Sequence, residues 1–474
     1  MDQVLDLDAV AQAELVKKGE ISALELVDAA IARAEALDPK LGAIATPLFD
    51  EARKTARSGR LDGPFAGVPM VVKDLGASVA GVPHTECSRL LAGAVADADS
   101  ELVTRFRRTG AVIVATTRAS EFGLLPSADS ALFGRCKNPW DLSRSTGGSS
   151  GGSAALVAAR VIALGHANDM GGSIRIPAAC CGLFGMKPTR ARTPLGPDFG
   201  DIGSGLVHQH AVTRSVRDSA LLLDAIAGPA PGDPYYAPPI ARPYADELRE
   251  PPGHLRIALS RQPLNGAPVD ADCIAALEDA ASLCSELGHE VVEAEPPSDD
   301  FEAVMSAYLL TASALLASII DLASRLTGRT PSAELLEPHT FALNSLGRSS
   351  TAADYLVAVN TLQRFSRRIA AFMADYPIWL TPTVNAPPLP LGVLDAPPDS
   401  PLLGFFHAGA FAAFTIPANI TGQPAMSVPL FWNAAGLPIG VQFAGRFGDE
   451  ATLFRLAAQL ERARPWTTRK PPIA

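Results

Sequence analysis

The amino-acid sequence predicts an α/β fold. Short apolar runs rich in β-branched residues recur along the chain, and stretches with helical periodicity separate them. Hydrophobic residues make up 47% of the 474 residues, which is enough to build a large core. Strands that alternate with helices of this length form sheets covered by helices.

The first predicted element is a helix near the N-terminus. Ser22 and Glu25 have the spacing of a capping box, and the periodic stretch LELVDAAIARAEAL accompanies them. We expect this helix to run to about Leu37 and to stop before Pro39, because proline inside a helix removes a hydrogen bond and clashes with the preceding turn.

Strands and helices then alternate through the front half of the chain. Residues 68–72, within GVPMVVKDL, are a β-branched run that predicts a buried strand with Lys73 at its end. The helical stretch DSELVTRFRRTG leads into AVIVATT, a second apolar strand. Farther on, the Gly- and Ser-rich stretch STGGSSGGS precedes an apolar helix, AALVAARVIAL.

The back half shows the same alternation. HLRIALS, DADCIAALEDAASLCSELG and HEVVEAE predict a strand, helix and strand unit within residues 254–295. The apolar stretch from Tyr308 to Ile320 is shorter than the ~20 residues that a membrane span needs. It predicts a buried helix or, alternatively, a cap over an apolar substrate entrance, and no membrane span is expected.

Two Pro- and Gly-rich stretches, 228–253 and 382–401, are candidate linkers or long surface loops. They divide the chain into two halves, but apolar segments continue on both sides of each. We therefore predict one large domain over residues 1–474.

The composition argues against several classes of protein. A net charge of −10 without a basic run argues against a nucleic-acid-binding surface. The N-terminus lacks the basic and apolar regions of a signal peptide, so the cytoplasm is the expected compartment. The six cysteines show no CxxC spacing, which predicts reduced, buried thiols. The histidines form no recognised zinc spacing, so we expect no metal.

The stretch STGGSSGGS, residues 145–153, has four interpretations. A phosphate loop is excluded, because no lysine lies between residues 138 and 186. A nucleophile elbow would need a strand before it, whereas the preceding NPWDLSRST is polar and turn-like. A flexible linker would not usually lead into an apolar helix. A Gly-rich turn at a helix N-terminus instead presents backbone N–H groups to an anion or a hydroxyl.

A second Gly- and Ser-rich turn follows in NDMGGSIRIP. Ser173 stands behind two glycines, an arrangement that lets backbone N–H groups point at one oxygen atom, although a plain turn is the alternative. Of the eight lysines, only Lys73 and Lys187 lie in strongly apolar surroundings. A buried lysine can have its pKa lowered far enough to act as a general base at neutral pH.

With these residues assembled, the sequence resembles the amidase signature family of serine hydrolases. The resemblance covers nearly the whole chain and is carried by four segments. They are PFAGVPMVVKDL (64–75), NPWDLSRSTGGSSGGSAALVA (138–158), GHANDMGGSIRIPAACCGLFGMKPTRAR (165–192) and NITGQPAMSVPL with GLPIGVQFAGRFGDE (419–450). Two further stretches, the N-terminal AQAELVKKGEISALELV and GPFAGVP, are similar to bacterial amidases that include the nylon-oligomer cyclic-dimer hydrolases.

The resemblance implies a fold and a division of the chain. The expected fold is a large, twisted, mixed β-sheet covered on both faces by helices. Residues 1–63 would form N-terminal helices, 64–228 the signature core with the catalytic residues, and 254–474 a C-terminal half whose loops help to build the substrate pocket.

Carried over to this sequence, the resemblance makes Ser173 the nucleophile and Lys73 the general base, with Ser149 bridging them. It also implies a cis peptide bond between Gly148 and Ser149. The backbone N–H groups of four residues would bind the oxyanion, and these residues are Met170, Gly171, Gly172 and Ser173. Asp169 and Arg175 match the charged pair that supports this turn in relatives.

The implied activity is cofactor-independent hydrolysis of a small carboxamide through an acyl-enzyme, with esters, anilides or carbamates as further substrates. The protein is expected to be a monomer or a homodimer. One alternative is a glutaminase subunit of a tRNA-dependent amidotransferase. Another is a catalytically inactive binding protein, against which the presence of all three polar residues, Lys73, Ser149 and Ser173, argues.

Overall fold

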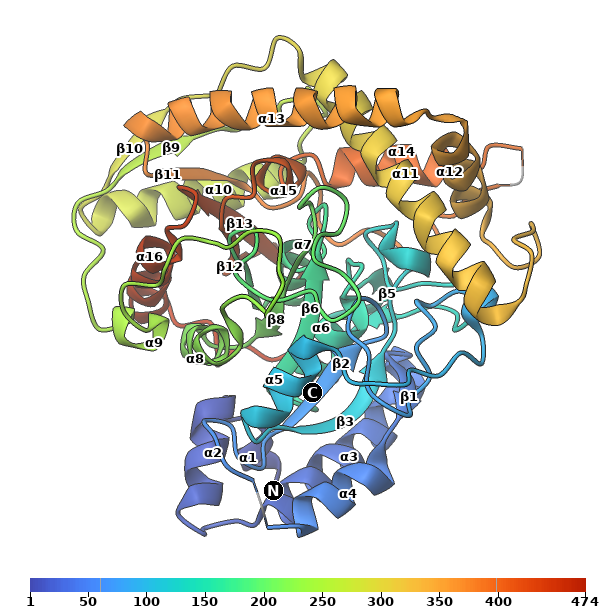
Figure 1. The fold of residues 1–474 in the computed structure, drawn as a ribbon. Coiled ribbons are helices and arrows are strands. Elements are labelled where there is room, and N and C mark those ends of the chain that lie inside the picture. Colours follow the sequence, from blue (N-terminus) through green and yellow to red (C-terminus); the bar gives the residue numbers. More distant parts are fainter. Residues whose placement is uncertain (60, 398) are drawn as a thin grey trace.

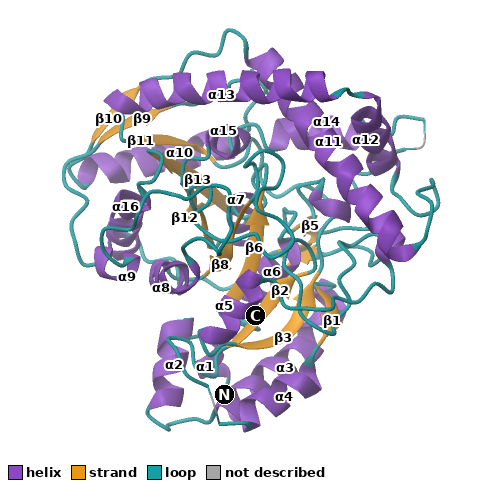
Figure 2. Cartoon of the chain, viewed as in Figure 1, coloured by secondary structure: helices purple, strands orange, loops and turns teal. Residues whose placement is uncertain are grey.

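The fold is built around one mixed β-sheet, which confirms the predicted α/β class. The computed structural model describes residues 1–59, 61–397 and 399–474, and eleven strands from these residues pair edge to edge (Figure 1, Figure 2). In spatial order they are β1 (Ile44–Pro47), β3 (Val112–Thr117), β2 (Pro69–Lys73), β6 (Leu164–Asp169), β8 (His208–Thr213), β7 (Phe184–Lys187), β12 (Ala425–Trp432), β13 (Pro438–Gly445), β11 (Ile378–Pro382), β9 (Arg256–Leu259) and β10 (Glu290–Glu293).

Helices cover the sheet on both faces (Figure 1). They are α1 (Asp2–Leu5), α2 (Ala9–Lys17), α3 (Ala23–Leu41), α4 (Phe49–Arg57), α5 (Glu101–Arg108), α6 (Gly151–Ala158), α7 (Arg175–Cys181), α8 (Val216–Ile226), α9 (Tyr244–Glu247), α10 (Ala271–Glu286), α11 (Phe301–Thr327), α12 (Pro338–Ser349), α13 (Ala352–Asp375), α14 (Leu403–Phe411), α15 (Ile416–Thr421) and α16 (Glu450–Ala463).

Strand β2 shows how the sheet separates two hydrophobic clusters. Met70 and Val72 pack with side chains of α5, α8, α10 and α16 on one face. Val71 packs with α3, α4, α6 and α7 on the other. Successive side chains of a strand point to opposite faces, so a strand covered on both sides is apolar at every position. This is why the run at 68–72 is continuous rather than alternating.

The N-terminal helix α3 begins as predicted and ends later. Ser22 and Glu25 form the capping box, each side chain accepting the backbone N–H of the other residue. The prediction that the helix stops before Pro39 was wrong, because α3 continues to Leu41. Pro39 lies in the last turn, where it removes a single intrahelical bond, and the Asp38 carboxylate accepts two backbone N–H groups just beyond the helix.

Other predicted elements are confirmed. The strand expected at 68–72 is β2, with Lys73 as its last residue, and α5 and β3 follow it. The unit predicted within residues 254–295 is β9, α10 and β10, and its two strands are parallel neighbours. All six cysteines are buried and free, in agreement with the expected reduced thiols.

The segment before Ser149 differs from the prediction. NPWDLSRST was expected to be turn-like, but it contributes strand β5 (Asp141–Ser145), which pairs with β4 (Lys137–Asn138) outside the main sheet. Most side chains of β5 are at least partly exposed, so polar residues suit it. Helix α6 also ends before the apolar run AALVAARVIAL does: its last residue is Ala158, whereas the run continues to Leu164.

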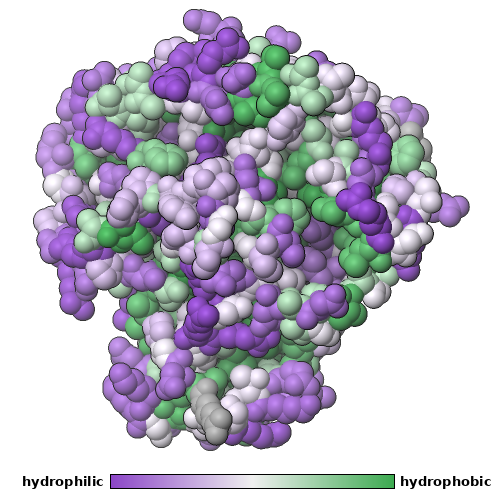
Figure 3. All heavy atoms as spheres, viewed as in Figure 1, coloured by the Kyte–Doolittle hydropathy of each residue, from purple (hydrophilic) through white to green (hydrophobic). Residues whose placement is uncertain are grey.

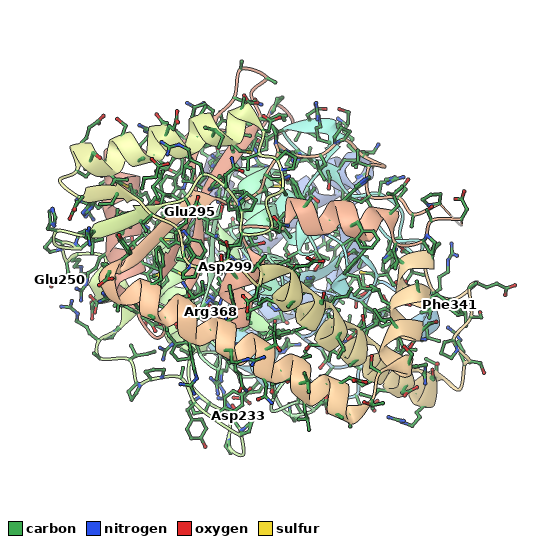
Figure 4. The ribbon with its side chains drawn as sticks, turned by 90° about the horizontal axis from the view of Figure 1, so that it is seen from above. Asp233, Glu250, Glu295, Asp299, Phe341 and Arg368 are labelled. Carbon is green, nitrogen blue, oxygen red and sulfur yellow. The ribbon has the colours of Figure 1, made fainter. Side chains whose placement is uncertain are left out.

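Helix α11 is longer than the apolar stretch that predicted it. Among the described helices it alone has the length and composition that could cross a membrane. It nevertheless packs against α12 and α13, and Val304, Tyr308 and Leu316 on its inner side are buried. Arg368 of α13 pairs with Asp300, the residue before α11, at 2.5 Å. Figure 4 shows Arg368 on its helix from above. Figure 3 shows hydrophilic and hydrophobic residues interspersed over the face that it draws.

Candidate active site

Two neighbouring parallel strands, β2 and β6, end at the same edge of the sheet. Strand β2 ends with Lys73, and β6 ends with Asn168 and Asp169. Ligands of open α/β sheets bind outside the carboxyl ends of strands, so a site is expected at this edge. Residues 170–173, the second Gly-rich turn, follow β6 directly, and the first such turn reaches the edge through Ser149.

Lys73 is fully buried and contacts two neutral oxygen atoms. Its Nζ lies 2.8 Å from Ser149 Oγ and 2.6 Å from Asn168 Oδ1. Burial lowers the pKa of Lys73 to about 7, although nearby acidic groups act in the opposite direction. A neutral amine at this distance can accept the proton of the Ser149 hydroxyl, so Lys73 has the properties of a general base near neutral pH.

A neutral histidine holds the backbone of Lys73. Nδ1 of His166 accepts the Lys73 N–H at 3.1 Å, and Nε2 lies 2.9 Å from Gln209 Oε1. Because Nδ1 accepts, Nε2 carries the proton and donates it to Gln209. Burial lowers the pKa of His166 to about 3, so this ring stays neutral and does not compete with Lys73 for a proton.

Acidic side chains border the other side of Lys73. The Asp74 carboxylate accepts hydrogen bonds from the N–H and the hydroxyl of Thr85 rather than pairing with the lysine. Burial raises the pKa of Asp74 and that of Glu86 to about 7 each. His84 lies 3.7 Å from Asp74 and 3.8 Å from Glu86. The charge beside the lysine therefore changes around neutral pH.

Ser149 lies in a closely packed turn between β5 and α6. The peptide bond from Gly148 to Ser149 is cis, as the family resemblance implied, and the Ser149 side chain is buried. Gly148 lies against the backbone of Ser127, which leaves no room for a Cβ atom, and a Cβ on Gly123 would come within 3.1 Å of Ser149 Oγ. The glycines of STGGSSGGS therefore permit close approach of backbones and do not act as a flexible linker.

Ser173 lies half-buried in the turn after β6, and its hydroxyl makes no hydrogen bond within the described residues. Gly172 has φ of 135°, and its N–H donates to Asp169 Oδ1 at 2.8 Å. This geometry does not support Gly172 as an oxyanion donor, because the N–H is already used inside the turn. The N–H groups of Met170, Gly171 and Ser173 have no acceptor among the described residues.

A buried ion pair anchors this turn. Asp169 and Arg175 are fully buried, with Nη2 of the arginine 2.9 Å from Oδ1 and Nε 3.0 Å from Oδ2. Burial alone would raise the pKa of Asp169, but the charge and hydrogen bonds of Arg175 lower it below its ordinary value. Arg175 also donates to the Thr415 carbonyl and to the side chains of Gln442 and Asn419. The turn is thus tied to the C-terminal half of the chain.

The structure joins only part of the predicted set by hydrogen bonds. Lys73 and Ser149 are in contact, whereas within the described residues no hydrogen bond connects Ser149 to Ser173. Asn168 was not predicted, although it stands two positions after His166 on β6 and so shares a face with it.

Lys187, the other lysine in apolar surroundings, is buried, and its Nζ donates to the Pro188 carbonyl at 2.9 Å, away from the contact between Lys73 and Ser149. The described residues contain no His, Cys, Asp and Glu cluster suited to a metal.

Both the sequence and the structure of the chain match known proteins of one family. A family model described as Amidase matches residues 25–454. The chain is 37% identical to the 6-aminohexanoate-cyclic-dimer hydrolase of Paenarthrobacter ureafaciens, over 98% of this chain and 96% of that protein. It is 38% identical to a putative amidase, AmiC, of Mycobacterium leprae, over 98% and 97%. A solved structure of 6-aminohexanoate cyclic dimer hydrolase with substrate matches at a TM-score of 0.93 and 36% identity, covering 99% of each chain. The chain therefore belongs to the Amidase family of enzymes, which hydrolyse amide bonds.

Proposed function

We propose that this enzyme hydrolyses uncharged carboxamides through an acyl-enzyme on Ser173. Neutral Lys73 takes a proton from Ser149, Ser149 takes the proton of Ser173, and Ser173 Oγ attacks the acyl carbon. The proton returns through Ser149 to the leaving nitrogen as the C–N bond breaks and the amine departs. Water then attacks the resulting ester, gives its proton to the same relay, and releases the carboxylic acid and free Ser173.

The observation that carries the proposal is the contact between the buried amine and the serine of the Gly-rich turn. Lys73 Nζ lies 2.8 Å from Ser149 Oγ, and the Lys73 side chain is inaccessible to solvent. A proton can pass directly across that distance, and burial favours the neutral amine that must receive it. The turn with Ser173 begins next to Asn168, which contacts the same amine.

An oxyanion formed on the substrate would be bound by backbone N–H groups. Met170, Gly171 and Ser173 have N–H groups with no acceptor among the described residues, and we assign the oxyanion to them. Removing one such donor typically costs about 10²–10³ in kcat.

The glutaminase alternative has less support. Glutamine carries an α-carboxylate, which would need a cation beside the nucleophile turn. The guanidinium of Arg175 already donates hydrogen bonds to Asp169 and to acceptors from the C-terminal half. Arg190 donates to the carbonyls of Gly205, Asn419 and Ile420. We therefore favour an uncharged substrate.

The surroundings of the turn favour an apolar substrate. Met170, Tyr308 and Ile416 belong to a hydrophobic cluster with residues of α11, α13 and α15. The relative from Paenarthrobacter ureafaciens is named for a cyclic dimer of 6-aminohexanoate, whose amides are uncharged. We propose neutral aliphatic or cyclic amides as the main substrates, with anilides, esters and carbamates as further ones, because the relay acts on an acyl carbon whatever its substituents.

A substrate panel tests the proposed class. Purified enzyme is given a neutral cyclic diamide, aliphatic amides, an anilide, an ester, an aryl carbamate and glutamine, and kcat/KM is compared. We expect a neutral amide to have the highest value and glutamine to show no measurable turnover. Preference for glutamine would overturn the proposal.

A fluorophosphonate probe tests the acyl-enzyme. It should label Ser173, as located by peptide mass spectrometry, and labelling at another serine would contradict the acyl-enzyme.

The pH dependence of catalysis provides a second test. The active form of Lys73 is the neutral amine, so kcat/KM should rise as pH increases through about 7 and should level off above it. Asn168→Asp places a carboxylate beside Nζ, which favours the ammonium form. We expect the rising limb to move to higher pH by about one unit or more. Asn265→Asp, in an exposed loop, is the matched control and should leave the limb in place. An unmoved limb in Asn168→Asp would contradict the role of Lys73.

A further inference from the structure

Two hydroxyl groups from distant parts of the chain hold the nucleophile turn by its carbonyl groups. The Tyr308 hydroxyl, on α11, donates to the Met170 carbonyl at 3.3 Å. The Thr415 hydroxyl, just before α15, lies 2.5 Å from the Gly171 carbonyl oxygen and 2.9 Å from that of Ala412, and its one proton is shared between these acceptors, with the Gly171 contact the shorter. Tyr308 is 9% exposed and Thr415 is fully buried, so water does not compete freely for either bond. The turn is therefore held from two sides by groups that lie outside the sheet.

Holding a carbonyl fixes the N–H of the same peptide unit. The peptide bonds after Met170 and Gly171 are trans, and in a trans peptide the C=O and the N–H point in opposite directions. The Tyr308 bond to the Met170 carbonyl thus directs the Gly171 N–H away from α11. The Thr415 bond to the Gly171 carbonyl directs the Gly172 N–H toward Asp169, which accepts it at 2.8 Å. Tyr308 thus orients the Gly171 N–H, which has no acceptor among the described residues, and Thr415 keeps the Gly172 N–H bonded to Asp169.

Tyr308 also fits closely against the peptide that it orients. A Cβ atom on Gly171 would lie 2.8 Å from the Tyr308 hydroxyl oxygen. Only glycine at this position therefore leaves room for the hydroxyl to lie where it reaches the Met170 carbonyl.

We infer that Tyr308 is a positioning residue, which sets the direction of the oxyanion-binding N–H of Gly171 through the Met170 carbonyl, and that Thr415 supports it by holding the next peptide unit, whose N–H donates to Asp169. The inference rests on the proposed acyl-enzyme mechanism. It adds to that mechanism a dependence on α11 and on the segment before α15, neither of which supplies the nucleophile or the base. An oxyanion donor that is not held in direction would have to be reoriented as charge develops, and preorganisation avoids that cost.

The test compares Tyr308→Phe with the wild-type enzyme on one neutral amide. We expect kcat to fall about tenfold, less than the roughly hundredfold or greater loss on removing a donor itself, while KM stays within about twofold. A trifluoromethyl ketone, which forms a tetrahedral oxyanion adduct with the nucleophile, should lose affinity by the same factor as kcat. The product carboxylic acid should bind as before. Tyr244→Phe, which removes the hydroxyl of another buried tyrosine, on α9, is the matched control and should change none of these values.

Two outcomes would overturn the inference. One is an unchanged kcat in Tyr308→Phe, and the other is a loss confined to KM, which would make Tyr308 a substrate-binding residue. If Tyr308→Phe does not fold, Thr415→Val decides the matter, because it frees the neighbouring peptide unit of the same turn and should lower kcat and ketone affinity together. An inactive Ser173→Ala together with wild-type behaviour of these variants refutes the positioning role alone. Turnover in Ser173→Ala refutes the proposed mechanism itself.

Discussion

Ser173→Ala is expected to abolish amide turnover while leaving the fold intact. The substitution removes the hydroxyl that attacks the acyl carbon, and loss of a nucleophile that works as part of a relay lowers kcat by roughly 10⁴-fold or more. The fold should persist, because the Ser173 hydroxyl makes no hydrogen bond within the described residues and its removal leaves no buried group without a partner. The release of a chromogenic amine from an anilide measures turnover, and thermal unfolding followed by circular dichroism measures the fold.

Three further variants test whether the loss of turnover comes from interrupting the proton relay. Lys73→Ala and Ser149→Ala should lower kcat by a comparable factor, since each interrupts the same proton transfer. Ser143→Ala removes a hydroxyl from an exposed serine on β5 and should behave as wild type. Appreciable turnover by Ser173→Ala, in preparations free of wild-type enzyme, would rule out Ser173 as the nucleophile.

Arg175→Met should give a large loss of stability. The substitution leaves the Asp169 carboxylate buried without its ion-pair partner, and it also removes a donor from Thr415, Asn419 and Gln442. Breaking one side of a buried ion pair costs about 3–5 kcal/mol of the free energy of unfolding. Activity should fall as well, because the turn that holds Ser173 loses its anchor. The midpoint of urea unfolding, with its slope, measures the change.

An exposed ion pair provides the comparison. Lys54 and Glu51 lie 2.6 Å apart on α4 with both side chains largely exposed. Lys54→Met should leave the free energy of unfolding almost unchanged, since exposed pairs are weak. A similar, small effect of Arg175→Met would show that the buried pair does not stabilise the fold.

The parts of the site that could be predicted are those encoded within short segments. The position of Lys73 at the end of β2 follows from a β-branched run, and the Gly-rich turns with Ser149 and Ser173 are visible as motifs. The cis bond at Gly148 came from the family resemblance and not from composition. Helix α3 shows the limit of local rules, because they place its start at the capping box correctly but end it before Pro39.

The missed contacts depend on long-range packing. Tyr308 and Thr415 are 138 and 244 residues away from the turn residues to which they donate. No local period relates them to that turn, since the pairing is set by how α11 and the segment before α15 pack on the sheet. Strand β5 was missed for a related reason. Its polar side chains suit a hairpin outside the main sheet, and that location is not encoded in the segment itself.

The anchor of the nucleophile turn also bears on how the enzyme is made. Thr415, Asn419 and Gln442, which complete the hydrogen bonds of Arg175, follow it by 240, 244 and 267 residues. A ribosome that adds about 5–20 residues per second takes roughly 12 to 53 seconds over this interval. During that time the nascent chain already contains Lys73, Ser149 and Ser173, but Arg175 lacks three of its acceptors. The order of synthesis therefore delays the assembled site until nearly the whole chain has been translated.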